Sequence, residues 1–282
     1  MSSLSPSNIN ALILAGKRNS DPFSEVENKA FLDIKGKLSI SWVIQALTQS
    51  KYLANEPFIS VKPTQVKLFE DKLGLSGTRY RLIENNGSPI DAIISCSLNL
   101  AKNSPAQKLL ITTADHPLLT PEMVDHFIEA AITQRSELAF GVVNGKRYPP
   151  SLLKRTWHRL NPDCWLSGAN LFFFEVDKLT GQVIFATRLV EGFRKKPILM
   201  SLSLALQNLS FIFKLIRQTA QLEDANEILS DASGIKVRLI ELPYSEACID
   251  IDKASDLEMA RRIMLSRSQA SSSNPSGSLL GI

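Results

Sequence analysis

Short apolar runs of strand length alternate with segments of helical spacing through the first 143 residues. This alternation restricts the possible folds more than any other feature of the sequence. Residues typical of strands lie in the runs 11–14, 58–61, 79–83, 109–112 and 138–143. Helical spacing is found between these runs, at 40–49, at 90–100 and from Pro121 onward. Because parallel strands need a long crossover connection, this order predicts an α/β fold with a mostly parallel sheet and helices on both of its faces.

The regular alternation ends after residue 143. The remaining segments are a basic and aromatic stretch at 144–162, strand-type runs at 169–174, 237–241 and 247–251, and helical patterns at about 177–229 and at 254–265. We expect one domain over residues 1–265, with the segment at about 177–229 as a helical insertion. The serine-rich tail 266–282 is expected to be disordered.

Composition argues against nucleic acid as a partner and against a membrane span. The net charge is only +4, from 32 basic and 28 acidic residues, so the chain as a whole has no strong field for nucleic acid. The apolar stretch 198–216 is interrupted by polar residues, which favours a buried or amphipathic helix over a membrane span.

The expected location is the cytoplasm. Residues 1–10 are polar and lack the pattern of an export signal. The cysteines Cys96, Cys164 and Cys248 are far apart and form no metal-binding pair. We interpret them as reduced thiols.

The first strand-type run ends at Leu14-Ala15-Gly16, and the basic residues Lys17, Arg18 and Lys29 follow. Gly16 allows a tight turn with exposed backbone N–H groups, which together with the basic side chains would bind a polyphosphate. The alternative interpretation is a solvated turn with surface charges, and Lys29 as a lysine whose ammonium group reaches solvent.

Two further loops follow strand-type runs. Gly87 and Ser88 allow a ligand to approach closely, although a simple capped turn explains them equally well. Asp115 ends a buried run, where a carboxylate is costly unless it is solvated, caps a turn or binds a cation such as Mg²⁺. His116 is expected to pack or to form hydrogen bonds rather than to bind a ligand.

The second half of the chain adds two candidate groups. The sequence Ser167-Gly168-Ala169-Asn170 at the start of a strand suits close contact with a sugar, or else forms an edge turn. Asp250 and Asp252 alternate along a strand-type run, so both are expected on one side, where one of them joins Asp115 around a metal. Asp256 is interpreted as a first-turn helix charge.

Taken together, these segments resemble the MobA-like nucleotidyltransferase superfamily, which includes the molybdenum cofactor guanylyltransferases. The resemblance covers residues 11 to about 265. It is carried by Leu14-Ala15-Gly16, Lys29-Ala30-Phe31-Leu32, Asp115-His116-Pro117-Leu118-Leu119, Gly168-Ala169-Asn170 and Asp250-Ile251-Asp252. It implies a Rossmann-like, three-layer nucleotide-diphospho-sugar transferase fold. The implied reaction transfers a nucleoside monophosphate from a nucleoside triphosphate to a phosphorylated small-molecule acceptor, with Mg²⁺ as cofactor and release of pyrophosphate.

The resemblance also implies a role for each candidate residue. Gly16, Lys17 and Arg18 would hold the β- and γ-phosphates, and Lys29 would stabilise charge on the α-phosphate. Asp115 and Asp252 would bind magnesium. The base and ribose would be bordered by Leu14, Ala15, Gly87 and Ser88, and the acceptor would face Gly168 and Asn170. Arg147, Tyr148, Lys154 and Arg155 would reach an acceptor phosphate, or form a solvated charged loop.

Two rival functions fit the sequence. A glycosyltransferase of related fold would use a similar metal-binding aspartate but consume a nucleotide-sugar. A catalytically degenerate nucleotide-binding protein is favoured by Lys17, which stands where most relatives have a second glycine. The sequence leaves open the base, the acceptor and the oligomeric state, for which a homodimer formed through the apolar segment 198–216 is one expectation.

Overall fold

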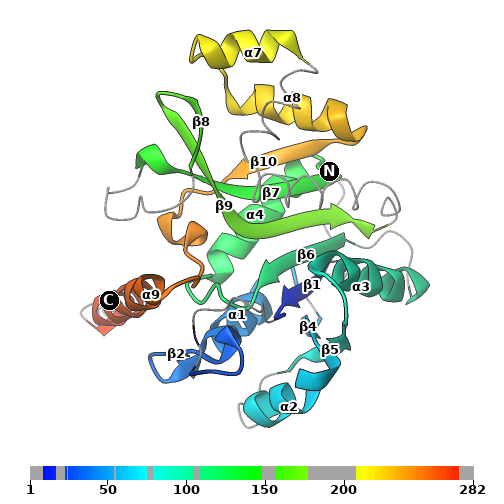
Figure 1. Ribbon diagram of the computed structural model, residues 1–282, viewed down its shortest axis with the longest axis vertical. Helices are drawn as coiled ribbons and strands as arrows, with labels where there is room; N and C mark the ends of the chain where they lie inside the picture. Colours follow the sequence, from blue (N-terminus) through cyan, green and yellow to red (C-terminus); the bar gives the residue numbers. More distant parts are fainter. Residues whose placement is uncertain are drawn as a thin grey trace, which may run out of the picture.

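The fold is built on a central sheet. The structure is a computed structural model, and it describes residues 9–16, 23, 25–53, 55–74, 79–103, 108–147, 157–176 and 208–272. Within these residues the sheet has eight strands, seven of them in the order β10-β7-β9-β6-β1-β4-β5 with β8 paired to β9 (Figure 1). The strands are β1 (Ile9–Leu14), β4 (Phe58–Val61), β5 (Arg81–Glu84), β6 (Lys108–Thr113), β7 (Leu138–Asn144), β8 (His158–Asn161), β9 (Cys164–Glu175) and β10 (Val237–Glu241).

The sheet is mostly parallel, as the alternation predicted. Strand β1 pairs in parallel with both β4 and β6, β4 with β5, and β10 with β7. Strand β9 runs antiparallel between β6 and β7. The carboxyl ends of β5, β4, β1 and β6 therefore lie along one edge of the sheet, which is where open α/β sheets bind ligands.

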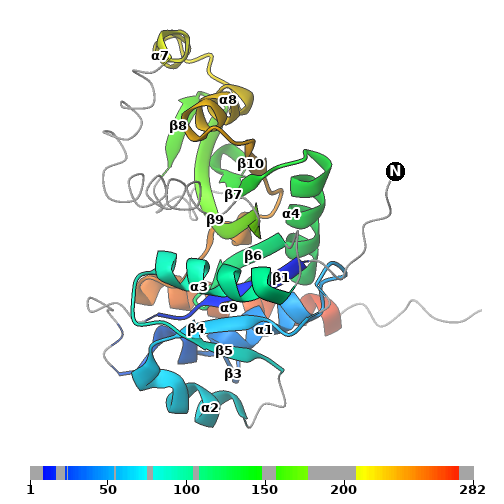
Figure 2. The same cartoon turned by 90° about the vertical axis from the view of Figure 1, so that its right-hand side faces the viewer.

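Helices cover both faces of the sheet and complete a three-layer fold (Figure 2). One face packs against α1 (Ser39–Thr48), α2 (Val66–Gly74), α4 (Pro121–Thr133) and α9 (Ala254–Ser272). The other packs against α3 (Pro89–Asn103) and α8 (Leu222–Ser233). Side chains of β1 alternate between the two cores, with Ile13 in the first and Leu12 in the second. The central strands β1, β4 and β6 are mostly buried on both sides for this reason.

Local sequence explains where several elements begin and end. Helix α4 begins at Pro121, as predicted, and Thr120 caps it by accepting a hydrogen bond from the Met123 backbone N–H. The small antiparallel pair β2 (Asp33–Ile34) and β3 (Lys37–Leu38) turns at Lys35 and Gly36, which both have positive φ.

The prediction of a strand at 247–251 is wrong. The segment forms the 3₁₀ turn η7 (Ser245–Cys248), in which Ala247 N–H donates to Tyr244 O, and then an extended stretch. Its apolar residues are buried in the core, which is why the sequence resembles a strand. They pack in the core, where η7 lies against β9 and β7, without joining the ladder.

Two boundaries in the last third of the chain also differ from prediction. The expected continuous helix at about 177–229 is interrupted between α7 (Leu209–Ile216) and α8, where Gln218 has positive φ; its part before residue 208 lies outside the described residues. The tail predicted to be disordered from residue 266 is helical up to Ser272. Tertiary contacts support this extension, because Met264 packs in the core and Arg267 donates to Leu118 O. The hydroxyls of Ser266 and Ser268 donate to the carbonyls four residues earlier. None of the described helices is both long and apolar enough to cross a membrane.

Candidate active site

Strands β1 and β6 lie side by side and end together, which fixes the centre of the site. Leu14 is opposite Thr113 in the parallel register. The pairing continues one residue further, since Ala114 N–H donates to Leu14 O at 3.0 Å and Ala15 N–H to Ser60 O at 3.1 Å. Asp115 follows directly, so its position at the carboxyl edge is set by the sheet itself.

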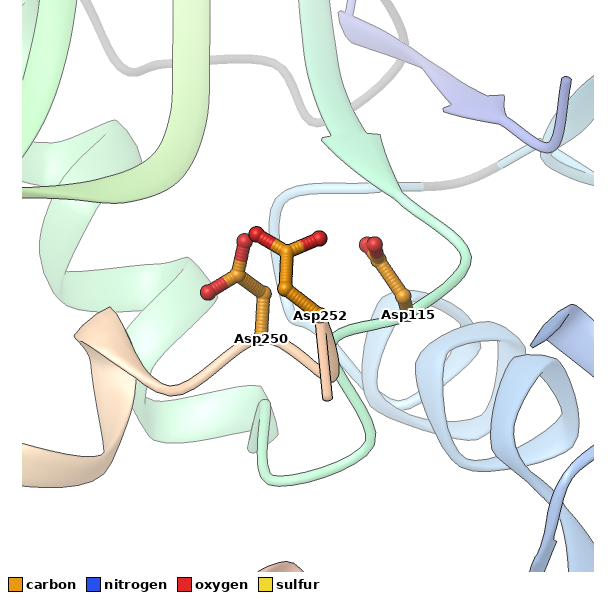
Figure 3. A group of neighbouring side chains, drawn as sticks. All are labelled: Asp115, Asp250 and Asp252. Atoms are coloured by element: carbon orange, nitrogen blue, oxygen red, sulfur yellow. The ribbon is translucent and has the colours of Figure 1, made fainter. Parts of the chain in front are cut away.

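Three carboxylates meet at this edge. Asp115, Asp250 and Asp252 each offer an oxygen, and these oxygens lie within 4.8 Å of one another. Figure 3 shows Asp115 on the loop after β6 and the other two on the segment that leads to α9, with all three side chains on the same side. Asp115 is buried and Asp252 is exposed. The prediction of Asp115 and Asp252 as neighbours is therefore matched by the geometry, and Asp250 joins them as well.

Backbone contacts hold the segment with Asp250 and Asp252 against the β6 loop. Ile251 N–H donates to Asp115 O at 2.9 Å. Asp256 accepts hydrogen bonds from the Asp252 and Lys253 N–H groups, both at 3.1 Å. Asp256 is thus in the first turn of α9 as predicted, and it fixes the backbone that carries Asp252.

Lys29 lies between the carboxylates. It opens the short 3₁₀ turn η2 (Lys29–Phe31), and its ammonium group forms an ion pair with Asp115. The same Nζ is 3.0 Å from Asp252 Oδ1 and 3.3 Å from Ile251 O. Burial lowers the pKa of Lys29, but the charges and hydrogen bonds of Asp115 and Asp252 outweigh it, so the pKa is raised above its usual value. Lys29 therefore stays protonated at neutral pH.

Asn28 positions Lys29, and the sequence patterns did not indicate this role. The Asn28 side chain is buried, and its amide donates to Ala15 O at 2.8 Å. Its oxygen accepts from Ala30 N–H at 2.9 Å, which caps η2. One side chain thus ties the turn that carries Lys29 to the end of β1. The sequence offered one sign of this positioning role, which is that an asparagine directly precedes the candidate lysine.

The donor set fits a hard divalent cation. Asp115 Oδ1 is buried and has no hydrogen-bond partner in the described part of the protein. A buried carboxylate oxygen without a partner is costly, and a cation would satisfy it. Carboxylate oxygens are the ligands that Mg²⁺ prefers, and Mg²⁺ is commonly held by one or two of them. Asp115, Asp252 and Asp250 are the residues that would hold it.

The loop after β5 is a capped helix start. Ser88 N–H and Oγ both contact Asp91 Oδ2, at 2.6 and 2.9 Å, and Pro89 begins α3. A Cβ at Gly87 would lie 2.0 Å from the same carboxylate oxygen, so glycine is needed for the cap. Both residues lie at the carboxyl edge, two strands away from β1. The cap accounts for them, and their contact with a nucleotide stays a prediction.

Gly168 and Asn170 lie inside β9, not at its start. The register between β7 and β9 shifts between Phe140/Phe172 and Val142/Gly168, so residues 169–171 bulge opposite Gly141. Asn170 has φ of +50°, a conformation that asparagine tolerates better than most residues. Gly168 is exposed. A strained backbone of this kind persists only where the surrounding structure enforces it.

The remaining predicted residues divide into two groups. Leu14 and Ala15 are at the end of β1, Gly16 follows them at the surface, and His116 is fully buried, in agreement with a packing role. Lys17, Arg18, Tyr148, Lys154 and Arg155 lie outside the described residues, and only the backbone of Arg147 is described.

Comparisons with known proteins identify a family and a fold. The family described as "MobA-like NTP transferase domain" matches residues 11–171, which is more than half of the chain. No curated protein sequence matches. Among solved structures, a hypothetical transferase from Thermus thermophilus is similar with a TM-score of 0.66 and 22% identity, over 89% of this chain and 99% of that one.

Two named synthetases share the fold. A CMP:2-keto-3-deoxy-manno-octonic acid synthetase solved with CTP has a TM-score of 0.58 and 16% identity, over 93% of this chain and 100% of that one. A 4-diphosphocytidyl-2C-methyl-D-erythritol synthase from Anaerococcus prevotii has a TM-score of 0.56 and 12% identity, over 93% and 98%.

Proposed function

The chain belongs to the MobA-like NTP transferase domain family and is a nucleotidyltransferase, and from this premise we propose which reaction it performs and with which residues. The proposed reaction transfers a nucleoside monophosphate from a nucleoside triphosphate to a phosphorylated small-molecule acceptor. The observation that carries the proposal is the group of Lys29, Asp115 and Asp252 at the carboxyl edge of β1 and β6.

The proposed reaction depends on neutralisation of negative charge more than on a strong base. An oxygen of the acceptor phosphate attacks the α-phosphorus, and the bond from the α-phosphorus to the bridging oxygen breaks, so that pyrophosphate leaves. A phosphate monoester is already ionised near neutral pH, so no side chain has to remove a proton. Catalysis then depends on holding the reactants in line and on balancing their negative charge.

Lys29 supplies a permanent positive charge for this purpose. Its raised pKa keeps the ammonium group protonated, and Asn28 and Asp115 hold it at the edge of the sheet. We propose that it stabilises charge on the α-phosphate. Gly16, Lys17 and Arg18, which follow β1 in sequence, are proposed to hold the β- and γ-phosphates.

Asp115 and Asp252 are proposed to bind Mg²⁺, with Asp250 beside them. The bound ion would supply Lewis-acid polarisation of the α-phosphate. Leu14, Ala15, Gly87 and Ser88 are proposed to border the base and ribose, and Gly168 and Asn170 to face the acceptor. The bulge in β9 supports the last assignment, because it exposes Gly168 and holds Asn170 in a left-handed conformation.

The cytoplasm remains the proposed location. The three cysteines are all free and buried, and burial raises the pKa of the Cys96 thiol to about 12, so that it is unreactive. Free thiols of this kind are usual where the environment is reducing.

The proposal is tested with the purified chain, Mg²⁺ and each of the four ribonucleoside triphosphates, by thermal unfolding. CTP is tried first, because one neighbour of the same fold was solved with it. A ligand that binds only the folded protein raises the melting temperature. We expect a rise with one triphosphate, lost in Asp115→Asn, and pyrophosphate release when phosphorylated acceptors are added.

Other outcomes separate the rivals. A rise with nucleotide-sugars alone would contradict the proposal and favour glycosyl transfer. Binding of a triphosphate without pyrophosphate release, across a panel of sugar and alcohol phosphates, would favour a degenerate nucleotide-binding protein.

A further inference from the structure

Arg267 joins the two loops that carry the three carboxylates. Its side chain projects from α9, in the stretch that the sequence predicted to be disordered. One guanidinium nitrogen donates to Leu118 O at 3.1 Å, on the loop that begins with Asp115. The other terminal nitrogen is 3.5 Å from Glu246 Oε1, in the turn η7 that precedes Asp250. The planar guanidinium group is suited to such a two-sided contact.

Both acceptors of Arg267 are themselves fixed. Ser245 Oγ donates to the second oxygen of Glu246 at 2.9 Å, which orients that carboxylate toward Arg267. Leu118 is fully buried, so the carbonyl that accepts from Arg267 belongs to an anchored residue. Arg267 therefore connects a buried residue of the Asp115 loop to an oriented carboxylate of the turn η7.

Apolar packing supports the same junction. Leu257, Ala260 and Met264 of α9 belong to the core cluster that also contains Leu118 and Ile251. Non-directional packing of this kind holds α9 against both loops, and the hydrogen bond from Ile251 N–H to Asp115 O joins the two loops at one point. Arg267 adds a second connection between the loops, through a directional hydrogen bond to Leu118 O and an ion pair with Glu246.

We infer that Arg267 is a positioning residue, which holds the Asp115 loop and the Asp250–Asp252 segment at the spacing that a divalent cation needs. The inference about spacing is independent of activity, whereas the cation itself rests on the proposed function. Residues that orient metal-binding carboxylates without touching the metal typically change metal affinity when they are replaced.

The test compares Arg267→Met, which keeps the apolar stem and removes both donors, with Arg262→Met, an exposed arginine of the same helix. The first readout is amide hydrogen exchange of the protein without metal. We expect exchange in residues 116–119 and 246–252 to rise about fivefold or more in Arg267→Met, with no change in β5 or in Arg262→Met. Unchanged exchange in both loops, or a rise confined to α9, would overturn the inference.

The second readout is binding of Mn²⁺ alone, followed by electron paramagnetic resonance. We expect Arg267→Met to bind Mn²⁺ about 10-fold more weakly than the unchanged protein, Arg267→Lys to be intermediate, and Arg262→Met to be unaffected. Asp115→Asn separates the two hypotheses. If it binds Mn²⁺ as well as the unchanged protein while Arg267→Met alters exchange in both loops, the metal assignment fails and the positioning role stands. If Asp115→Asn loses Mn²⁺ and Arg267→Met does not, the role of Arg267 in the site is wrong.

Discussion

The part of the chain that the family match covers and the part after residue 208 contribute to the candidate site in different ways. In residues 11–171, the region that the family match covers, Asp115 is placed by the register of β1 and β6. Lys29 lies on the turn η2, which Asn28 ties to the end of β1. In residues 208–272 the carboxylates Asp250 and Asp252 belong to no strand. They are placed by tertiary contacts, including an ion pair between Asp252 and Lys29, which are 223 residues apart.

This difference shows which part of the site is held by the sheet and which part depends on tertiary contacts of a segment outside the sheet. A side chain at the end of a buried parallel strand is fixed by the ladder around it. A side chain on an extended segment is only as well placed as the contacts that hold the segment. Substitutions in the first region should therefore abolish chemistry, and those in the second should weaken it.

The largest effect is expected for Asp115→Asn. This change removes the buried carboxylate at the centre of the site, and we expect turnover to fall by about 10³-fold or more with the fold retained. Pyrophosphate release and circular dichroism measure the two parts of this prediction. Asp71→Asn on the exposed face of α2 is the matched control and should be neutral. Near-normal turnover in Asp115→Asn with Mg²⁺ would refute the metal assignment.

Lys29→Met should affect both activity and stability. It leaves Asp115 buried without its cation, and breaking a buried ion pair in this way costs about 3 kcal/mol. Mg²⁺ should restore more stability to Lys29→Met than to the unchanged protein, because the lysine no longer competes for Asp115 and Asp252. Urea unfolding with and without Mg²⁺ measures this, and Lys253→Met, which is exposed, is the control. Equal stabilisation of both proteins by Mg²⁺ would argue against a shared site.

The contribution of Lys29 to stability should depend on pH in one direction. Its pKa is raised in the folded protein, so the folded form binds the proton more tightly than the unfolded chain does. The stabilisation is fully present below the unfolded pKa of about 10.4 and is lost as the pH rises through the folded value. The difference in unfolding midpoint between the unchanged protein and Lys29→Met should thus be constant from pH 7 to about pH 10 and then shrink. A difference that instead shrinks between pH 7 and about pH 9 would contradict the cause assigned here.

Asn28→Ala is expected to have a smaller effect on stability. The change removes the cap of η2 and leaves the buried Ala15 carbonyl without its donor, at a cost of about 2 kcal/mol. Asn28→Ser keeps a cap acceptor but is too short to reach Ala15 O, so it should lose about half as much. Chemical denaturation distinguishes them, and equal losses would assign the whole effect to the contact with Ala15.

The smallest effect is expected for Ile216→Ser in α7. This side chain is 74% exposed, so its replacement should change the free energy of unfolding by less than about 0.5 kcal/mol. The same variant tests the homodimer expected from the apolar segment. If α7 is a dimer surface, sedimentation velocity will show a dimer for the unchanged protein and a monomer for Ile216→Ser. A monomer in both cases would remove that expectation.

The same contrast explains how much could be predicted from sequence. The α/β fold, the strand at 58–61 and the position of Asp115 follow from local pattern, because a strand buried on both faces is a mostly apolar run. The strand at 237–241 was also predicted correctly, although β10 is an edge strand and is only partly buried. Local pattern failed at 247–251, where buried apolar residues imitate a strand but form a turn and an extended segment.

The roles of Asn28 and Arg267 could not be predicted for a related reason. Each acts through contacts with residues that are distant in sequence, Arg267 with Leu118 and Asn28 with Ala15. A serine-rich composition after residue 265 suggested disorder, yet the packing of α9 and the hydrogen bond from Arg267 to Leu118 O hold the helix beyond that point. Periodicity within a single segment carries no information about such partners.

The most direct measurement of the central claim is calorimetric titration of the stabilising nucleoside triphosphate, with Mg²⁺, into the unchanged protein, Asp115→Asn and Asp252→Asn. The account predicts that both variants bind the Mg²⁺–triphosphate complex more weakly, Asp115→Asn most, because the two regions of the chain form one site. Binding by Asp252→Asn that equals that of the unchanged protein, while Asp115→Asn loses it, would contradict a site shared between the two regions.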